Sequence, residues 1–142
     1  MIFYLSNEKG AKTLFYKQTR NSVRNVLSSD YVEFKKTPLS KNTSDNFERL
    51  MVHCFYDENN LLQEIEIFEP NKVYIKEDNF IGKTQSEIED YLNHLDLEYE
   101  LDDMGFIVND IGMSTVSNKN HRAECIYFNM EKSPSLKILS NN

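Results

Sequence analysis

Only two segments of this chain have the spacing of an amphipathic helix, and most of the remaining sequence alternates as β-strands do. The clearer helix starts at Thr84-Gln85-Ser86-Glu87, a capping box in which the threonine and glutamate side chains each bond the other residue's backbone amide. Apolar side chains then recur along one helical face: Ile88, Tyr91, Leu92 and Leu95. We therefore predict a helix over residues 85–95 that buries Leu92 against a sheet.

A shorter helix is predicted over residues 20–28, after the N-cap residue Thr19. An offset of 65 residues places Thr19 on Thr84 and Val23 on Ile88. Two explanations remain open. Either the chain contains two related units, each a helix followed by a meander of strands, or two amphipathic helices resemble each other by chance.

The clearest β-hairpin joins residues 50–56 to residues 61–69 through the turn Asp57-Glu58-Asn59-Asn60. Isoleucines and glutamates alternate in its second strand, so Glu64 and Glu66 are expected to face away from the apolar side. Further strands are predicted over residues 2–5, 14–16, 31–34, 73–75, 97–101, 106–108, 111–117 and 123–130.

Strands interrupted by only two helices are typical of the α+β class, here an antiparallel β-sheet with two amphipathic helices. We expect the helix over 85–95 to pack on a sheet that contains the hairpin described above. Residues 37–46 are rich in Ser, Asn, Asp and Pro, which predicts a loop. Residues 1–130 are predicted to form a single α+β domain, and residues 131–142 a flexible C-terminal tail.

The composition argues against several classes of protein. Hydrophobic residues make up 39% of the chain, which is too much for a disordered protein despite the net charge of −7. The longest apolar runs have four or five residues, whereas a membrane-spanning helix needs roughly 20. The start of the chain lacks the basic region and the cleavage site of a signal peptide. We expect a cytoplasmic protein that does not bind membranes.

The sequence carries no recognisable motif of a catalytic, metal or cofactor site. Its four glycines are scattered and form no phosphate-binding loop. Cys54 and Cys125 lie in apolar, strand-like runs, where we expect buried thiols and no disulfide or metal ligands. The many carboxylates are expected to face solvent, which leaves their pKa lower than a catalytic acid requires. We therefore predict that the protein is not an enzyme and binds no cofactor.

Charge is distributed unevenly along the chain. Residues 1–50 carry a net charge of +4, residues 51–118 carry −13, and residues 119–142 carry +2. Nine acidic residues and no Lys or Arg lie between Lys83 and Lys119. A surface of one sign repels nucleic acid and anionic lipid and attracts basic partners. The alternative interpretation is a solvated face that only keeps the protein soluble.

Six acidic residues are the candidates for contact with a basic partner. Two lie on the polar side of the hairpin and four follow the second predicted helix: Glu64, Glu66, Glu98, Glu100, Asp102 and Asp103. We expect a protein partner and no nucleic acid, and the sequence leaves the oligomeric state open.

Three motifs follow one another in the second half of the chain. They are the helix start Gly82-Lys83-Thr84-Gln85-Ser86-Glu87-Ile88, the turn Asp102-Asp103-Met104-Gly105-Phe106 and the strand start Ile111-Gly112-Met113. Together with the preceding hairpin, over about residues 50–130, they resemble small acidic immunity proteins of bacterial polymorphic-toxin and contact-dependent growth inhibition systems. The first 50 residues depart from this pattern, since Lys17-Gln18-Thr19 stands where a glycine precedes the helix in such proteins.

The resemblance implies an immunity protein that binds a cognate toxin and neutralises it by masking its active site or its substrate surface. The partner would be the toxin's C-terminal domain, and the acidic surface would suit a basic, nuclease-type toxin. The alternative is a non-catalytic protein- or ligand-binding domain of the same fold that has no toxin partner.

Overall fold

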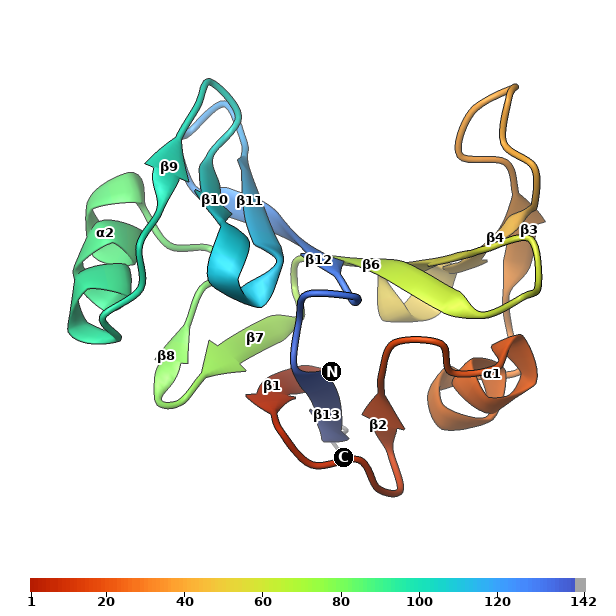
Figure 1. The fold of residues 1–142 in the computed structure, drawn as a ribbon. Coiled ribbons are helices and arrows are strands. Elements are labelled where there is room, and N and C mark those ends of the chain that lie inside the picture. The colour runs from red at the N-terminus through yellow and green to blue at the C-terminus, as the bar shows by residue number, and fades with distance from the viewer. Residues whose placement is uncertain (140–142) are drawn as a thin grey trace.

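The computed structural model describes residues 1–139, which form two β-sheets and two α-helices and confirm the α+β class (Figure 1). All strand pairs of the eight-stranded sheet are antiparallel, whereas the five-stranded sheet contains one parallel pair, β1–β7. Within these residues, no helix has the length and hydropathy needed to cross a membrane.

The eight-stranded sheet contains, in spatial order, β3 (Val32–Phe34), β4 (Ser44–Phe47), β5 (Val52–Tyr56), β6 (Leu62–Phe68), β12 (Ala123–Asn129), β11 (Met113–Ser117), β10 (Phe106–Val108) and β9 (Glu100–Leu101). The five-stranded sheet contains β2 (Thr13–Leu14), β13 (Ser135–Leu139), β1 (Ile2–Ser6), β7 (Lys72–Ile75) and β8 (Asp78–Asn79).

The chain consists of two halves with the same order of elements, which is the first of the two explanations that the offset between the helices left open. Helix α1 (Arg20–Leu27) is followed by β3 to β6, and helix α2 (Gln85–His94) is followed by β9 to β12. Each half contains one 3-10 turn in front of its second pair of strands: η1 (Glu48–Leu50) precedes β5, and η2 (Asn109–Ile111) precedes β11. The two helices therefore resemble each other because the whole units do.

The backbone in front of the two helices shows the same repeat. Lys17 and Gly82 each stand two residues before the N-cap, and both have a left-handed backbone, with φ of 64° and 79°. The Lys17 amide donates to the carbonyl of Leu62 (2.9 Å), and the Gly82 amide donates to the equivalent carbonyl of Ala123 (2.7 Å). The lysine at the position of the missing glycine thus adopts the conformation that usually favours glycine.

The two halves meet at the centre of the eight-stranded sheet, where β6 pairs with β12. Glu66 lies opposite Tyr127, which occupies the equivalent position in the second half, and matched pairs such as Ile65–Phe128 flank them. The sheet therefore has an approximate twofold axis at the Glu66–Tyr127 pair, and its outer edges, β3 and β9, are equivalent strands.

The hydrophobic core lies between the two sheets. Ile65 and Phe128 of the eight-stranded sheet are fully buried, as are Phe3 and Val73 of the five-stranded sheet, and all four belong to one core cluster. The other face of the eight-stranded sheet points away from both helices and from the five-stranded sheet, and none of these elements covers it (Figure 1).

Helix α2 begins with the predicted capping box. The amide of Glu87 donates to Oγ1 of Thr84 (3.3 Å), and the amide of Thr84 donates to Oε1 of Glu87 (3.2 Å). Leu92 is fully buried, as its position on the apolar stripe predicted. The helix lies beside the β9–β12 half of the sheet (Figure 1). This sheet also contains the hairpin strands β5 and β6, as expected, but they lie in its other half, which is the half that contains α1.

Two local predictions were wrong within the eight-stranded sheet. Residues 44–47 form β4 inside the segment that its polar composition predicted as a loop. The polar Asp45 is fully buried there, because ion pairs replace the apolar side chains of an ordinary inner strand. The predicted strand over residues 97–101 is reduced to Glu100–Leu101, since only these residues pair with β10.

The prediction of a flexible tail over residues 131–142 was also wrong for the part that the structure describes. Residues 135–139 form β13, which pairs with both β1 and β2. Leu136 and Ile138 are buried in the core, and this burial stabilises the strand although the residues before it have the composition of a turn. Residues 140–142 of the predicted tail lie outside the described residues.

A buried ionic network joins α1 to β4. The carboxylate of Asp45 accepts hydrogen bonds from Nη2 of Arg20 (2.8 Å), from Nε of Arg24 (2.8 Å) and from the hydroxyl of Tyr56 (2.9 Å). Arg20 also bonds Glu33 on β3 (3.1 Å), so one guanidinium connects three elements. Burial alone would raise the pKa of Asp45, but the hydrogen bonds from Arg24, Arg20 and Tyr56 outweigh it and lower that pKa.

Leu92→Ala should lower the free energy of unfolding by about 2–5 kcal/mol, because it leaves a cavity under α2. Urea unfolding followed by circular dichroism measures this loss. Leu101→Ala is the matched control, since Leu101 is 46% exposed, and it should cost about 0.5 kcal/mol or less. Equal losses in the two variants would contradict the packing of α2.

Asp45→Ala should lower the free energy of unfolding by about 3–5 kcal/mol, because it leaves Arg20 and Arg24 without their buried counter-charge. Glu33→Ala is the matched control. It removes a carboxylate that bonds the same Arg20, but the Glu33 side chain is 52% exposed, so the loss should be clearly smaller. A Glu33→Ala loss as large as that of Asp45→Ala would contradict the dominant role of the buried carboxylate.

The network also predicts a dependence of stability on pH. Because the pKa of Asp45 is lower in the folded than in the unfolded chain, its stabilisation is complete above the ordinary value of 3.8 and is lost as the pH falls through the lowered value. The urea midpoint should fall with pH below about 4, and it should fall less steeply in Asp45→Asn, which cannot ionise. Parallel declines in the two proteins would assign the effect to other carboxylates.

Candidate functional site

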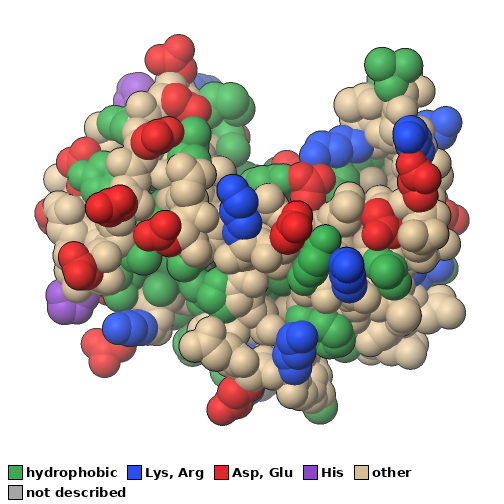
Figure 2. Space-filling view, viewed as in Figure 1, with side chains coloured by type: hydrophobic (Ala, Val, Ile, Leu, Met, Phe, Trp, Pro, Cys, Tyr) green, Lys and Arg blue, Asp and Glu red, His purple; other side chains and the backbone are tan. Residues whose placement is uncertain are grey.

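The face of the eight-stranded sheet that points away from the core forms an open trough. Its side chains follow from the strand register, because paired residues point to the same side of a sheet. One row crosses all eight strands and contains, in spatial order, Val32, Asn46, His53, Glu66, Tyr127, Ser114, Ile107 and Glu100. Figure 2 shows the trough as the hollow between two raised ends of the molecule.

The two raised ends are equivalent connections of the two halves. One is the loop 35–43 between β3 and β4, and the other is the turn 102–105 between β9 and β10 (Figure 1). The loop is the longer of the two. Its residues line a hollow together with Phe55 and Glu64 of the trough. The trough is therefore bounded at both ends by segments that rise above the sheet.

Glu64 and Glu66 lie in the middle of the trough, as the alternation of the hairpin predicted. Both are only partly exposed and both have partners within the chain. Glu64 forms an ion pair with Nζ of Lys36 (3.1 Å) and accepts a hydrogen bond from the hydroxyl of Tyr127. Glu66 lies 3.4 Å from Nδ1 of His53. The charge of Glu64 is thus largely compensated by Lys36, which the sequence did not indicate.

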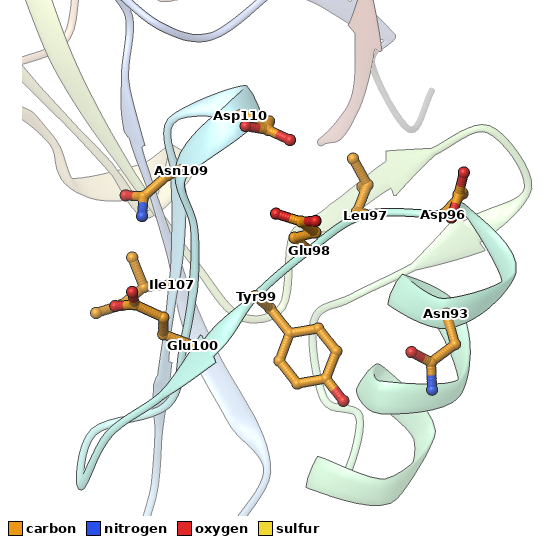
Figure 3. A pocket seen from close by; sticks show the side chains of 9 residues that line it. All are labelled: Asn93, Asp96, Leu97, Glu98, Tyr99, Glu100, Ile107, Asn109 and Asp110. Atoms are coloured by element: carbon orange, nitrogen blue, oxygen red, sulfur yellow. The ribbon is translucent and has the colours of Figure 1, made fainter.

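Glu98 and Glu100 line an acidic hollow at the β9–β10 end of the trough. It is formed by the end of α2, β9 and the η2 turn, and its volume is about 630 Å³. Figure 3 shows the carboxylates of Glu98 and Asp110 directed into it. All the charged residues that line it are acidic: Asp96, Glu98, Glu100 and Asp110. None of these four carboxylates forms an ion pair with a described residue.

The acidic hollow is continuous with the trough, because Glu100 and Ile107 belong both to its lining and to the row that crosses the sheet. Its volume lies in the range of about 300–1,000 Å³ that is typical of small-molecule sites, but such sites are mostly apolar. Four carboxylates with no internal cation instead favour the guanidinium or ammonium groups of a basic partner.

Asp102 and Asp103 occupy the turn at the raised end next to this hollow. Oδ1 of Asp102 accepts hydrogen bonds from the amides of Met104 (2.8 Å) and Gly105 (3.0 Å), so this carboxylate stabilises the turn. Asp103 is exposed. The six acids predicted from the sequence therefore divide into Glu64 and Glu66 in the trough, Glu98 and Glu100 in the acidic hollow, and two residues on the adjacent turn.

The opposite end of the trough has a different charge pattern. The loop 35–43 carries Lys35, Lys36 and Lys41, of which two are paired with a glutamate: Lys36 with Glu64, and Lys41 with Glu58 (3.0 Å). The excess of positive charge in the first 50 residues is thus partly neutralised within the chain. The unpaired carboxylates of the acidic hollow make the β9–β10 end the more negative one.

Groups that carry nucleophilic or metal chemistry do not converge at either end of the trough. Burial raises the pKa of Cys54 and raises that of Cys125 to about 12, so both thiols remain protonated at neutral pH. Among residues 1–139, no three His, Cys, Asp or Glu side chains are placed to hold one metal ion.

The aromatic part of the trough was not predicted from the sequence. The ring of His53 lies 5.0 Å from that of Phe34 and 4.9 Å from that of Phe68, centroid to centroid. The alternation in the hairpin could have placed His53 on this face, because His53 lies opposite Glu66. Phe34 comes from a strand distant in sequence, and no local pattern specifies which strands pair.

The trough and the acidic hollow are both features of the eight-stranded sheet and the segments at its ends. Both follow from strand register, side-chain exposure and the placement of charged groups. Comparisons with protein-family models, with curated proteins and with solved structures found no match to this chain.

Proposed function

We propose that this chain is an immunity protein that binds the C-terminal domain of a cognate bacterial toxin, a basic nuclease-type domain, and neutralises it. Binding would mask the toxin's active site or the surface that receives its substrate. The proposal needs no catalytic group in this chain and no cofactor, because neutralisation requires only a stable complementary surface.

The acidic hollow is the observation that carries the proposal. Asp96, Glu98, Glu100 and Asp110 surround one concave surface, and none of them is paired with a cation of the described chain. Nucleases are basic where they hold the phosphate backbone. A concave surface lined with carboxylates presents negative charge to such a domain, as the phosphates of its nucleic-acid substrate do.

The charge of the hollow acts mainly on the rate of encounter. A cleft lined by one sign of charge raises the association rate by about 10- to 1,000-fold, and salt screens this effect over a Debye length of about 8 Å at physiological ionic strength. Rapid capture matters for an inhibitor that must reach the toxin before the nucleic acid does. Slow dissociation requires buried anchors in addition, because exposed charges at a rim mostly change the association rate.

A binding domain without a toxin partner is the alternative function, and the same surface would serve it. The two functions differ in the identity of the partner and in the biological readout. An immunity protein must bind the toxin domain encoded by the neighbouring gene and must restore growth when that toxin is expressed.

Glu98→Lys with Glu100→Lys should slow association with that toxin domain by about tenfold or more at low salt and should flatten the dependence of the rate on ionic strength. Both side chains are exposed, so the fold should be unchanged. Asp102 is left in place because it stabilises the turn. Stopped-flow association rates at several salt concentrations measure the effect, with growth protection as the second readout.

Glu8→Lys with Glu77→Lys is the matched control. It changes the net charge by the same amount, but these exposed residues belong to connections of the five-stranded sheet and do not line the acidic hollow. Its association rate should stay close to that of the wild type. Equal slowing in both variants would mean that only net charge matters, and failure of the wild type to bind the toxin domain or protect cells would refute the proposed function.

A further inference from the structure

We propose that the trough anchors the partner, and that it receives a segment of the toxin domain in which a basic side chain lies between apolar ones. This inference rests on the proposed function and adds the surface and the chemistry that hold the partner after the acidic hollow has attracted it. Three features of the trough carry it: an aromatic floor, two apolar tips and an excess of carboxylates.

The aromatic floor lies on β3, β5 and β6. His53 is at its centre, with its ring 5.0 Å from Phe34, 6.2 Å from Phe55 and 4.9 Å from Phe68, centroid to centroid. His53, Phe34 and Phe68 are half-buried, so their ring faces and edges remain accessible on a sheet face that no described element covers. Aromatic groups at the centre of a surface are the usual anchors of protein interfaces.

The two raised ends of the trough each expose one large apolar side chain. Leu39 in the loop 35–43 is 92% exposed, and Met104 in the turn 102–105 is 60% exposed. Polar residues occupy most exposed turns, and neither side chain contributes to the core. The tips occupy equivalent connections in the two halves, one at each end of the same row of side chains. A partner seated between them would bury both.

The charged groups of the trough favour a cationic group on the partner. Glu64, Glu66 and Glu100 face it. Of the three lysines that line hollows on the same side, Lys36 is paired with Glu64 (3.1 Å) and Lys41 with Glu58 (3.0 Å), and Lys132 lies beside Ser114 and Tyr127. Glu66 sits beside His53 at the centre of the floor (3.4 Å). An incoming Lys or Arg side chain could therefore contact both an aromatic ring and a carboxylate.

A second copy of this chain suits the trough poorly. A symmetric contact whose axis passes through the centre of the trough would place Glu66 opposite Glu66 of the other copy. Like charges placed opposite each other weaken an interface. The charge of the trough thus selects a basic partner over self-association.

Leu39→Asp combined with Met104→Asp separates anchoring from attraction. The double variant adds two negative charges, so attraction alone would leave association unchanged or make it faster. If the tips are buried by the partner, dissociation should instead become about tenfold faster or more, because apolar anchors are replaced by desolvated charges. The experiment measures both rates by surface plasmon resonance with the toxin domain encoded by the neighbouring gene.

Leu139→Asp is the matched control, because Leu139 is an apolar side chain that is 44% exposed on β13 of the other sheet. It should change neither rate, and circular dichroism should show wild-type spectra for both variants. A double variant that dissociates as slowly as the wild type would overturn this inference and leave the proposed function standing. A wild-type protein that does not bind the toxin domain would overturn both.

Discussion

The carboxylate of Asp45, buried with two arginines, determines how the first half of the molecule is built. A fully buried charge is tolerated only where cations and hydrogen-bond donors compensate for the water that it has lost. Arg20 and Arg24 do this from consecutive turns of α1, and Arg20 reaches on to Thr43 Oγ1 (3.0 Å) at the base of the long loop. The same interaction that holds α1 against β4 therefore also fixes one wall of the trough.

The second half has the same order of elements, but an aromatic side chain is buried in it where the first half buries a charged one. Phe106 occupies the position of Asp45 and is buried, with its ring 5.3 Å from that of Tyr99. Glu89 stands on α2 where Arg24 stands on α1. One half thus uses its arginines inside, where they neutralise an acid, and the other places unpaired acids on its surface. This difference converts a modest net charge into a strongly negative end of one concave face.

The local patterns in the sequence were sufficient to predict the elements that depend on near neighbours. The capping box at Thr84 and the alternation around Ile65 involve residues within a few positions of each other, and both gave the observed helix and hairpin. β4 and β13 could not be found in this way. β4 is an inner strand only because Arg20 and Arg24 neutralise Asp45, and β13 exists because β1, at the other end of the chain, provides its partner.

The same limit applies to the candidate site. Acidic residues after the second helix were identifiable from composition, and Glu98 and Glu100 do line one hollow. The pairing of Glu64 with Lys36, and the row that joins Glu66 to Glu100, depend on which strands are neighbours. That order is set by the central β6–β12 pair, which brings together residues about 60 positions apart.

The position of β1 has a consequence for synthesis of the protein on the ribosome. β1 lies between β7 and β13 in its sheet, so it leaves the ribosome before either of its neighbours, and β13 is the last described strand. At about 5–20 residues per second, several seconds pass before both neighbours of β1 have been made. During that time the apolar Phe3 lacks part of its cover, and the nascent chain presents an unpaired strand edge of the kind that promotes aggregation. Premature termination before β13 would leave that edge of β1 unpaired permanently.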